Sequence, residues 1–206
     1  MKLLLFSDLH CDASAARSIV ARAGGVDVLV GAGDFASVRR GIHVCIDILK
    51  AVTKPAVLVP GNNETEDELR SACQSWPSAI VLHGAGTEIA GVRFFGLGGG
   101  VPVTPFGPWS FDLTEAEAAS KLADCPRGCV LVSHSPPKGV LDASSRGVRL
   151  GSTAVLDAIN TKQPALVVCG HIHESGGRTA SVGASAVVNA GPGGIDWTLA
   201  HENLSR

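Results

Sequence analysis

The sequence predicts an α/β fold from five short apolar runs, the polar residues that follow each run, and the helical patterns between them. The runs are rich in Val and Leu and are bounded by turn residues, which is typical of strands buried on both faces. They cover residues 3–6, 26–30, 56–59, 130–132 and 165–168. Because strands that alternate with helices form βαβ units, the pattern indicates an α/β architecture.

Helical patterns lie between several of these runs. Ser14 is a plausible cap for the first, and Gly24 and Gly25 end it. Thr114 and Glu117 have the spacing of a capping box before a third helix. The predicted helices cover residues 14–23, 38–52, about 115–124, and a segment that Ser152 caps and that runs to about Asn160.

Two regions depart from the βαβ rhythm. Residues 79–97 contain the apolar stretches 80–83 and 92–95 with a turn signal at Ala90 and Gly91, which suggests a hairpin-like strand region. The tail from 181 to 199 behaves similarly. A mixed sheet, or two sheets packed face to face with outer helices, accommodates this pattern better than one open parallel sheet. The Gly- and Pro-rich run 96–108 predicts a long surface loop of the kind that is often functional.

Composition limits the partners of the chain. Its 206 residues predict a single domain over 1–206, and 45% of them are apolar. The balance of 17 basic and 19 acidic residues gives a net charge of −2. Such a chain has no sequence-wide positive field that would attract nucleic acid or an anionic membrane. We therefore expect a small partner and only local contacts with phosphate.

The N-terminal run and the cysteines favour a cytoplasmic location. The apolar stretch Leu3–Phe6 is too short for a signal-peptide core or a membrane span. The six cysteines are scattered and form no CxxC pair, so we expect reduced thiols, with Cys45, Cys129 and Cys169 as small core residues.

Polar residues that can bind a metal follow each of the five strands. Since ligand sites lie outside the carboxyl ends of strands, we expect these residues to converge. They are Asp8, His10, Asp34, Asn62, His134, His171 and His173. The mixture of carboxylate, imidazole and amide donors suits Mn, Fe or Zn. Seven ligands suit two metals that share one carboxylate, an arrangement that serves hydrolysis of a phosphate ester by water activated on the metals.

The ordered motifs resemble one known family. Asp8-Leu-His10, Gly33-Asp34, Gly61-Asn62-Asn63-Glu64, His134 and Gly170-His-Ile-His173 look like the calcineurin-like metallophosphoesterases, most closely the small prokaryotic Icc-related predicted phosphoesterases. The motifs extend from residue 8 to residue 173. The resemblance implies a four-layer αββα sandwich, in accord with the two-sheet interpretation.

The resemblance also implies how the ligands divide. Asp8, His10, Asp34 and His173 would hold a first metal, and Asp34 would bridge to a second. Asn62, His134 and His171 would complete the second site. The implied cofactors are two divalent or trivalent ions, with Mn²⁺ favoured and Fe, Zn or Ni as alternatives. The implied activity is hydrolysis of a small phosphomonoester or phosphodiester through attack on phosphorus by a hydroxide between the metals.

Asn63 is a departure from the family pattern. Many members have His at this position, where it contacts the phosphate and can protonate the leaving group. An amide can hydrogen-bond the phosphate but cannot act as a general acid near neutral pH. A phosphate contact through Asn63 is therefore retained as an expectation, while the preference for diesters and the source of the leaving-group proton stay open.

Several other residues have two interpretations. Glu64 either orients groups of the site or caps the following helix. Asn189 lies near the site or forms a turn, and we favour the turn. Gly98, Gly99 and Gly100 either present N–H groups to a phosphate or belong to a connector. Four arginines could bind phosphate, although we favour solvated surface positions for them: Arg39, Arg40, Arg146 and Arg149. Three histidines match no motif: His43, His83 and His201.

Two other functions remain as alternatives to a small-molecule phosphoesterase. A metal-dependent nuclease would use the same chemistry, but the charge balance and the lack of a basic stripe interleaved with aromatic residues argue against it. A non-catalytic metal-binding module would keep the fold. The sequence does not lose any predicted ligand, which argues against that alternative. The substrate, the metal identities and the oligomeric state stay open.

Overall fold

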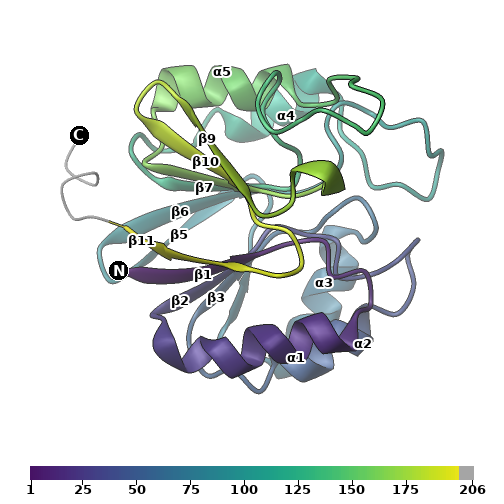
Figure 1. Ribbon diagram of the computed structural model, residues 1–206, viewed down its shortest axis with the longest axis vertical. Coiled ribbons are helices and arrows are strands. Elements are labelled where there is room, and N and C mark those ends of the chain that lie inside the picture. Colours follow the sequence, from purple (N-terminus) through teal and green to yellow (C-terminus); the bar gives the residue numbers. More distant parts are fainter. Residues whose placement is uncertain (200–206) are drawn as a thin grey trace.

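The computed structural model describes residues 1–199, which form two β-sheets packed face to face between two layers of helices (Figure 1). Three helices cover the first sheet: α1 (Ala13–Arg22), α2 (Ile42–Leu49) and α3 (Glu66–Ala72). Two cover the second: α4 (Glu115–Leu122) and α5 (Thr153–Lys162). The predicted four-layer αββα sandwich with two mixed sheets is confirmed.

The first sheet has five strands in the order β11-β1-β2-β3-β4. The strands are β1 (Lys2–Phe6), β2 (Val28–Gly31), β3 (Ala56–Leu58), β4 (Ala79–Val81) and β11 (Ile195–Thr198). Strands β1 to β4 are parallel, and β11 pairs antiparallel with β1. This last pairing brings the C-terminal part of the chain back beside its first strand.

The second sheet has six strands in the order β5-β6-β7-β8-β10-β9. They are β5 (Ala85–Ile89), β6 (Val92–Leu97), β7 (Val130–Ser133), β8 (Leu166–Cys169), β9 (Arg178–Val182) and β10 (Ser185–Asn189). The four inner strands are parallel, and each edge strand pairs antiparallel with its neighbour. Short 3₁₀ turns occupy Ala23–Gly25, Cys73–Ser75 and His173–Ser175.

Alternation along the strands divides the apolar residues among three cores. In β1, Leu3 and Leu5 face the second sheet, whereas Leu4 and Phe6 face helices α1 to α3. The third core lies between the second sheet and α4 and α5. Full burial of a Leu or Phe side chain contributes about 1.5–3 kcal/mol, so the continuous Val and Leu runs stabilise all four layers.

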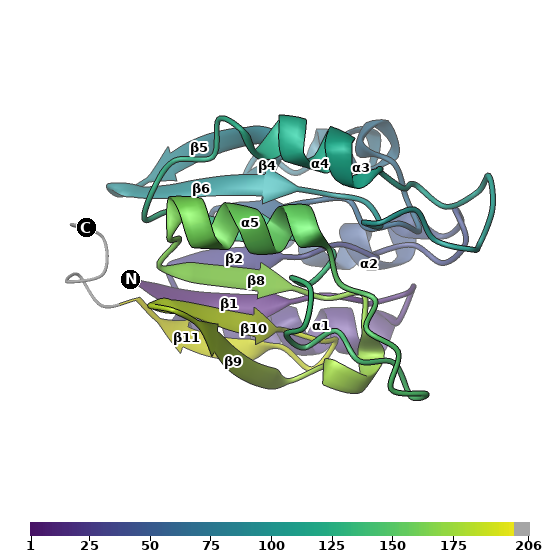
Figure 2. The same ribbon diagram turned by 90° about the horizontal axis from the view of Figure 1, so that it is seen from above.

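The carboxyl ends of the parallel strands meet along one side of the sandwich (Figure 2). There the loops that follow β1, β2, β3, β7 and β8 gather, while the N-terminus lies on the opposite side in this view. The fold therefore brings the predicted polar residues to a common edge, as expected for α/β sheets.

The predicted hairpin of residues 79–97 was wrong in its first strand. β4 does not pair with β6 but joins the first sheet in parallel with β3. The hairpin partner of β6 is β5, which turns at Ala90 and Gly91 as predicted. β5 is an edge strand with alternating, mostly exposed residues, so it lacks an apolar run that would identify it.

Two helix starts and one loop also differ from the predictions. Asp12, not Ser14, caps α1, because its side chain accepts from the N–H groups of Ser14 and Ala15. α2 begins at Ile42 rather than at 38, since Val38 and Arg39 adopt positive φ in a tight turn. The capping box before α4 and the Ser152 cap of α5 are confirmed.

The expected surface loop 96–108 is exposed only in part. Gly96 and Leu97 belong to β6, and residues 98–101 are buried. The exposed segment begins at Pro102.

The cysteines are free thiols, as predicted, and Cys45, Cys129 and Cys169 are buried. Among residues 1–199, no helix combines the length and the apolar character needed to cross a bilayer.

Glu115 links helix α4 to the first turn of helix α5, and its charge makes the stability of this contact depend on pH. Its carboxylate accepts from Ser152 Oγ at 2.7 Å, from Thr153 N at 2.9 Å and from Ala154 N at 2.8 Å. Burial alone would raise the pKa of Glu115, but these hydrogen bonds outweigh it and lower the pKa from its ordinary value near 4.5. At neutral pH, Glu115→Gln should lower the free energy of unfolding by about 1–2 kcal/mol.

Because the folded-state pKa is depressed, this contribution exists above pH 4.5 and is lost as the pH falls below it. Urea denaturation of both proteins across this range measures the difference. Glu117→Gln, which affects only the exposed capping box of α4, is the control and should cost less. An equal cost of Glu115→Gln at low and neutral pH would contradict this account.

Candidate metal centre

Backbone hydrogen bonds fasten the loop after β1 to the loop after β2. Asp8 N donates to Gly33 O, and His10 N donates to Asp34 O, both at 2.9 Å. These bonds set three of the predicted ligands side by side. The pairing follows from the parallel β1 and β2 register, which delivers both loops to the same edge of the sheet.

Four of the seven predicted ligands have a left-handed backbone. The φ angles are 57° for Asp8, 43° for His10, 59° for Asp34 and 66° for His171. Asp and His enter this region more readily than most residues, yet each such position costs about 1–3 kcal/mol. Strain of this kind persists only where the surroundings enforce it, and it clusters at functional sites.

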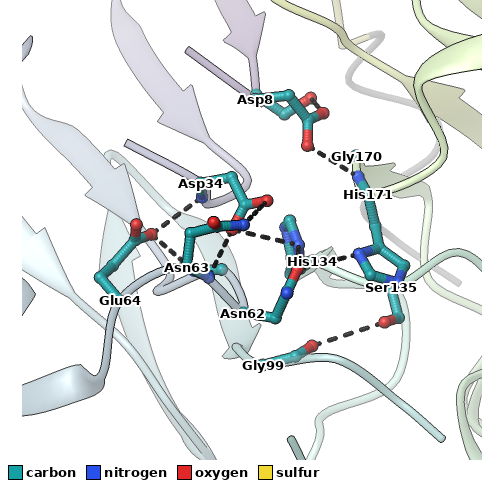
Figure 3. Close-up of polar contacts among 12 residues, drawn as sticks. Asp8, Asp34, Asn62, Asn63, Glu64, Gly99, His134, Ser135, Gly170 and His171 are labelled. Atoms are coloured by element: carbon teal, nitrogen blue, oxygen red, sulfur yellow. Dashed lines mark hydrogen bonds and ion pairs between the residues drawn. The ribbon is translucent and has the colours of Figure 1, made fainter. Parts of the chain in front are cut away.

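Asp34 is buried at the centre of the cluster, and Asn63 holds both of its oxygens. Asn63 N donates to Oδ1 at 2.8 Å, and Asn63 Nδ2 donates to Oδ2 at 2.7 Å (Figure 3). The other side of the Asn63 amide, Oδ1, accepts from Val38 N at 2.7 Å. The Asn63 side chain therefore orients Asp34 in this structure. Its Nδ2 carries a second N–H, and Asn63 lines the cavity beside the cluster, so the phosphate contact stays a prediction.

Glu64 is fully buried and fixes the backbone around Asp34. Its carboxylate accepts from Asp34 N at 2.8 Å, Ala36 N at 2.9 Å and Gly61 N at 2.7 Å. Burial and the Asp34 charge raise the pKa of Glu64 to about 7, and the Gly61 and Ala36 N–H groups oppose that rise. Of its two interpretations, the orienting one is confirmed, because Thr65 caps α3.

Two motif glycines allow these loops to approach closely. A Cβ atom at Gly61 would collide with the backbone N and side-chain Oδ1 of Asp34. At Gly33, φ is +91°, and a Cβ would lie 2.7 Å from His134 Nδ1. Side chains at either position would separate Asp34 from its neighbours.

Backbone carbonyls determine which nitrogen of two histidines faces the cluster. His10 Nδ1 lies 3.2 Å from Ala36 O, and His134 Nδ1 lies 2.8 Å from Ala32 O. Because a carbonyl only accepts, we assign the ring proton to Nδ1 in both residues. The Nε2 lone pairs of His10 and His134 then point into the cluster, as they would in a metal ligand.

The Asn62 amide is oriented by a loop whose role the sequence did not reveal. Asn62 Nδ2 donates to Ser110 Oγ at 3.0 Å, and Ser110 Oγ donates to Asp112 Oδ1 at 2.8 Å. Asn62 Oδ1 consequently faces His134 Nε2 at 3.2 Å and His171 Nδ1 at 3.1 Å. Ser110 and Asp112 lie in an irregular segment, where no periodicity identifies a role.

Asn189 clamps the loop that carries His171 and His173. It is buried, and its Nδ2 donates to Gly170 O and to Ile172 O, both at 3.0 Å. His171 N also donates to Asp8 Oδ1 at 3.0 Å. The favoured interpretation of Asn189 as a turn residue was therefore wrong, because its side chain positions the site.

The donor atoms fall into two groups that share Asp34. Asp34 Oδ2 lies 3.5 Å from His10 Nε2, which lies 3.1 Å from His173 Nε2. His173 Nε2 in turn lies 3.7 Å from Asp8 Oδ1. Asp34 Oδ1 lies 3.5 Å from His134 Nε2, on the side of Asn62 and His171. The structure thus brings all seven predicted residues together, with one Asp34 oxygen directed to each group.

The charges of the cluster favour an ionised Asp34. Burial would raise the pKa of Asp34, but His134 and His10 outweigh it and lower the pKa. Conversely, burial would lower the pKa of His134, and Asp34 and Asp8 raise it. Burial, assisted by His134, lowers the pKa of His171 to about 4, so that His171 is neutral at pH 7 and able to donate a lone pair.

The remaining candidates lie outside the cluster or have other partners. Arg39 pairs with Glu68 and Arg149 with Asp142, both at 2.8 Å, while Arg40 and Arg146 are exposed. His43 is exposed on α2, and His201 lies outside the described residues.

The three neighbouring glycines and His83 have structural partners. Gly98 N donates to His83 Nδ1, Gly99 N to Pro60 O and Gly100 N to Phe111 O. These N–H groups are therefore occupied within the protein, which favours the connector interpretation. His83 is buried with a pKa lowered to about 4 by burial, in keeping with the structural interpretation.

Comparison with known families identifies the family of this chain. The sequence model of the Calcineurin-like phosphoesterase superfamily domain matches residues 1–203. The chain belongs to the calcineurin-like phosphoesterase superfamily. The family predicted from the five motifs is confirmed.

Curated relatives agree with this membership. Metallophosphoesterase domain-containing protein 1 of Homo sapiens is 33% identical over 138 residues, which cover 65% of this chain and 39% of that protein. The Mus musculus protein of the same name matches with the same values. The matched region therefore spans well under half the length of these relatives.

Solved structures share the fold. The TT1561 protein of Thermus thermophilus has a TM-score of 0.70 with 23% identity and covers 92% of this chain and 88% of that one. A dimetal phosphatase from Danio rerio has a TM-score of 0.59 with 14% identity and covers 92% and 86%. At these identities, the likeness concerns the αββα fold.

The Asn189 clamp leads to a prediction about stability. Asn189→Ala removes one of the two N–H donors of each carbonyl, since Ile172 N and Ser175 N also donate to them. The loss of two buried hydrogen bonds should lower the free energy of unfolding by about 2 kcal/mol. Asn189→Asp keeps the shape but places a carboxylate oxygen against the same carbonyls, so it should cost at least as much. Urea denaturation of the three proteins measures this. A stable Asn189→Asp protein would contradict the assigned hydrogen bonds.

Proposed function

We propose that this protein is a binuclear metal-dependent phosphoesterase that hydrolyses a small phosphomonoester or phosphodiester. The observation that carries the proposal is the division of seven donor side chains into two groups, with one oxygen of Asp34 directed to each. A single carboxylate between two donor groups is the arrangement that two-metal hydrolases use.

The chemistry of the donor set supports bound cations. With the proton of His134 on Nδ1, its Nε2 lone pair faces Asn62 Oδ1 at 3.2 Å, and neither atom has a proton to donate. Asp34 Oδ1 approaches the same nitrogen. Three electron-rich atoms converge here, and they repel one another unless a positive charge lies between them, either a metal ion or a second proton on His134.

The proposed ligands follow the family pattern. Asp8, His10, Asp34 and His173 would hold one ion, and Asp34, Asn62, His134 and His171 the other. When bound, the two ions would supply positive charge against the phosphate oxygens and lower the pKa of coordinated water. With the ions bound, the imidazoles would be neutral, Asp34 would be ionised, and the Asn62 carbonyl would be held in place by Ser110. We propose Mn²⁺ as the physiological metal, with Fe, Zn or Ni as alternatives for the same donors.

Asn63 stands where many family members have histidine, and we propose that its remaining side-chain N–H contacts the phosphate while its other two N–H groups hold Asp34. Both of its N–H contacts with Asp34 keep the shared carboxylate in place. Because an amide cannot transfer a proton near neutral pH, we propose that the leaving group takes its proton from water. Substrates with stable leaving groups should be preferred for this reason.

The cavity beside the donor groups suits a small substrate. It has a volume of about 340 Å³, and among residues 1–199 no lysine or arginine lines it. Recognition of nucleic acid needs repeated cationic contacts with phosphates, so the nuclease alternative has little support. We propose a small phosphate ester as partner, and a cytoplasmic location in keeping with the six free thiols.

The proposed function is tested by metal removal and by Asp34→Asn. Protein treated with a chelator should not hydrolyse p-nitrophenyl phosphate or bis-p-nitrophenyl phosphate, and Mn²⁺ should restore activity. Asp34→Asn should lower kcat by more than about a hundredfold, because the shared charge is lost. Elemental analysis should find two ions in the wild type and fewer in the variant.

Asp196→Asn is the matched control, since Asp196 pairs with Arg22 far from the donor groups. It should keep full activity. Hydrolysis by Asp34→Asn at the wild-type rate would contradict the two-metal mechanism. Two bound ions with no hydrolysis of either ester would support the non-catalytic alternative.

Ser110 provides a test of the Asn62 orientation. Ser110→Ala removes the acceptor of Asn62 Nδ2, so the amide can rotate and present N–H to the donor group. Loss of such an orienting partner should weaken Mn²⁺ binding by about tenfold or more. Calorimetric Mn²⁺ titration measures this, with Ser181→Ala on β9 as the control. Unchanged affinity for Mn²⁺ in Ser110→Ala would show that Ser110 does not orient the ligand.

A further inference from the structure

An aromatic pair forms one wall of the cavity beside the donor groups. The rings of Phe106 and Trp109 stack with centroids 5.5 Å apart and an interplanar angle of 19°. Both residues line the cavity, together with Leu150 and Ile172 from other loops. Phe106 is 52% exposed and Leu150 is 41% exposed, so this apolar wall faces solvent next to the donor groups.

Trp109 is held in place by contacts with the site itself, and Phe106 stacks on it. Arg39 Nη1 donates to Trp109 O at 3.3 Å, and Arg39 N donates to Asn63 O at 2.9 Å. The next residue, Ser110, is the partner of Asn62. The Trp109–Ser110 part of the segment is thus fastened to Arg39 and to Asn62. A wall fixed in this way loses little entropy when a ligand binds.

The charges around the cavity limit the class of ligand that can bind there. The segment 101–111 contains no charged residue. No lysine or arginine of the described chain lines the cavity, and its one acidic residue beyond Asp34 is Glu174. A second phosphate would therefore face Glu174 without a cation to neutralise it, whereas an uncharged planar ring can lie against the apolar wall.

We propose that Phe106 and Trp109 bind the organic part of the phosphate ester, and that this part is a planar aromatic ring that carries a single phosphate. The proposal deepens the proposed function and rests on it, because the donor groups must hold the phosphate. It assigns substrate preference to two side chains that are not metal ligands. The ring lies on an aromatic surface, and the phosphate lies at the donor groups.

Binding of non-hydrolysable phosphonates to the Mn²⁺-loaded protein tests the proposal without relying on activity. Phenylphosphonate, cyclohexylphosphonate and methylphosphonate carry the same anionic group on a planar ring, a puckered ring and a methyl group. Isothermal titration calorimetry at an alkaline pH, where all three are dianions, gives their affinities. Inorganic phosphate reports the donor groups alone.

Phenylphosphonate should bind about tenfold tighter than methylphosphonate, as expected for one ring stacked on an aromatic side chain, with cyclohexylphosphonate in between. Trp109→Ala and Phe106→Ala should each remove much of this preference and leave the affinities for methylphosphonate and inorganic phosphate unchanged. Trp109→Phe should retain most of it. Val103→Ala, an exposed apolar residue of the same segment outside the cavity wall, should change nothing.

Three results would overturn the proposal while the proposed function stands. They are equal binding of the phenyl and cyclohexyl compounds, a phenyl preference that survives both alanine variants, and an equal weakening of all ligands in Trp109→Ala with no effect of Phe106→Ala. The last result would give Trp109 a role in holding Asn62. Failure of inorganic phosphate and every phosphonate to bind the loaded wild type would instead refute the proposed function.

A nucleoside monophosphate distinguishes two sources of the planar ring. If Trp109→Ala weakens its binding as much as that of phenylphosphonate, the subsite accepts a nucleobase. If the variant affects phenylphosphonate alone, the subsite accepts only an aryl group close to phosphorus. Both results support an aromatic subsite.

Discussion

The site depends on a buried carboxylate that must stay ionised and must direct its two oxygens in different directions. Asp34 meets this requirement because Asn63 donates to each oxygen and Glu64 holds the N–H of Asp34 itself. Burial alone would raise the pKa of such a carboxyl group and favour its neutral form. Here, nearby histidines lower the pKa of Asp34 despite its burial. Two acidic residues thus lie close together inside the protein, and the network of N–H donors makes this tolerable.

The fold supplies this carboxylate with partners from both sheets. β1, β2 and β3 of the first sheet deliver Asp8, Asp34 and Asn62, and β7 and β8 of the second deliver His134 and His171. Because the sheets pack face to face, the two sets of loops meet at one edge. The buried Val and Leu residues between the sheets therefore set the geometry of the donor groups as well as the stability of the fold.

The sequence predicted those parts of the structure in which a residue's role follows from its own strand or helix. Buried parallel strands are continuous apolar runs, so the five ligand-bearing loops were recognisable, and the ordered motifs then identified the family. Edge strands such as β5 were missed, since their partly exposed residues resemble a loop. The roles of Asn189 and Ser110 were missed for another reason. Each acts through a hydrogen bond to a residue distant in sequence, and neither bond leaves a local pattern.

The segment that carries Ser110 joins two properties that are usually considered separately. Ser110 orients the Asn62 amide through one hydrogen bond, and Trp109 beside it forms the apolar wall of the cavity. A movement of this segment would alter the aromatic wall and the Asn62 donor together, because Arg39 and Asp112 fasten the same few residues. Changes in this loop during evolution would therefore be constrained. New substrate preferences would arise more readily by exchange of the exposed Phe106 side chain than by remodelling of the backbone that holds Asn62.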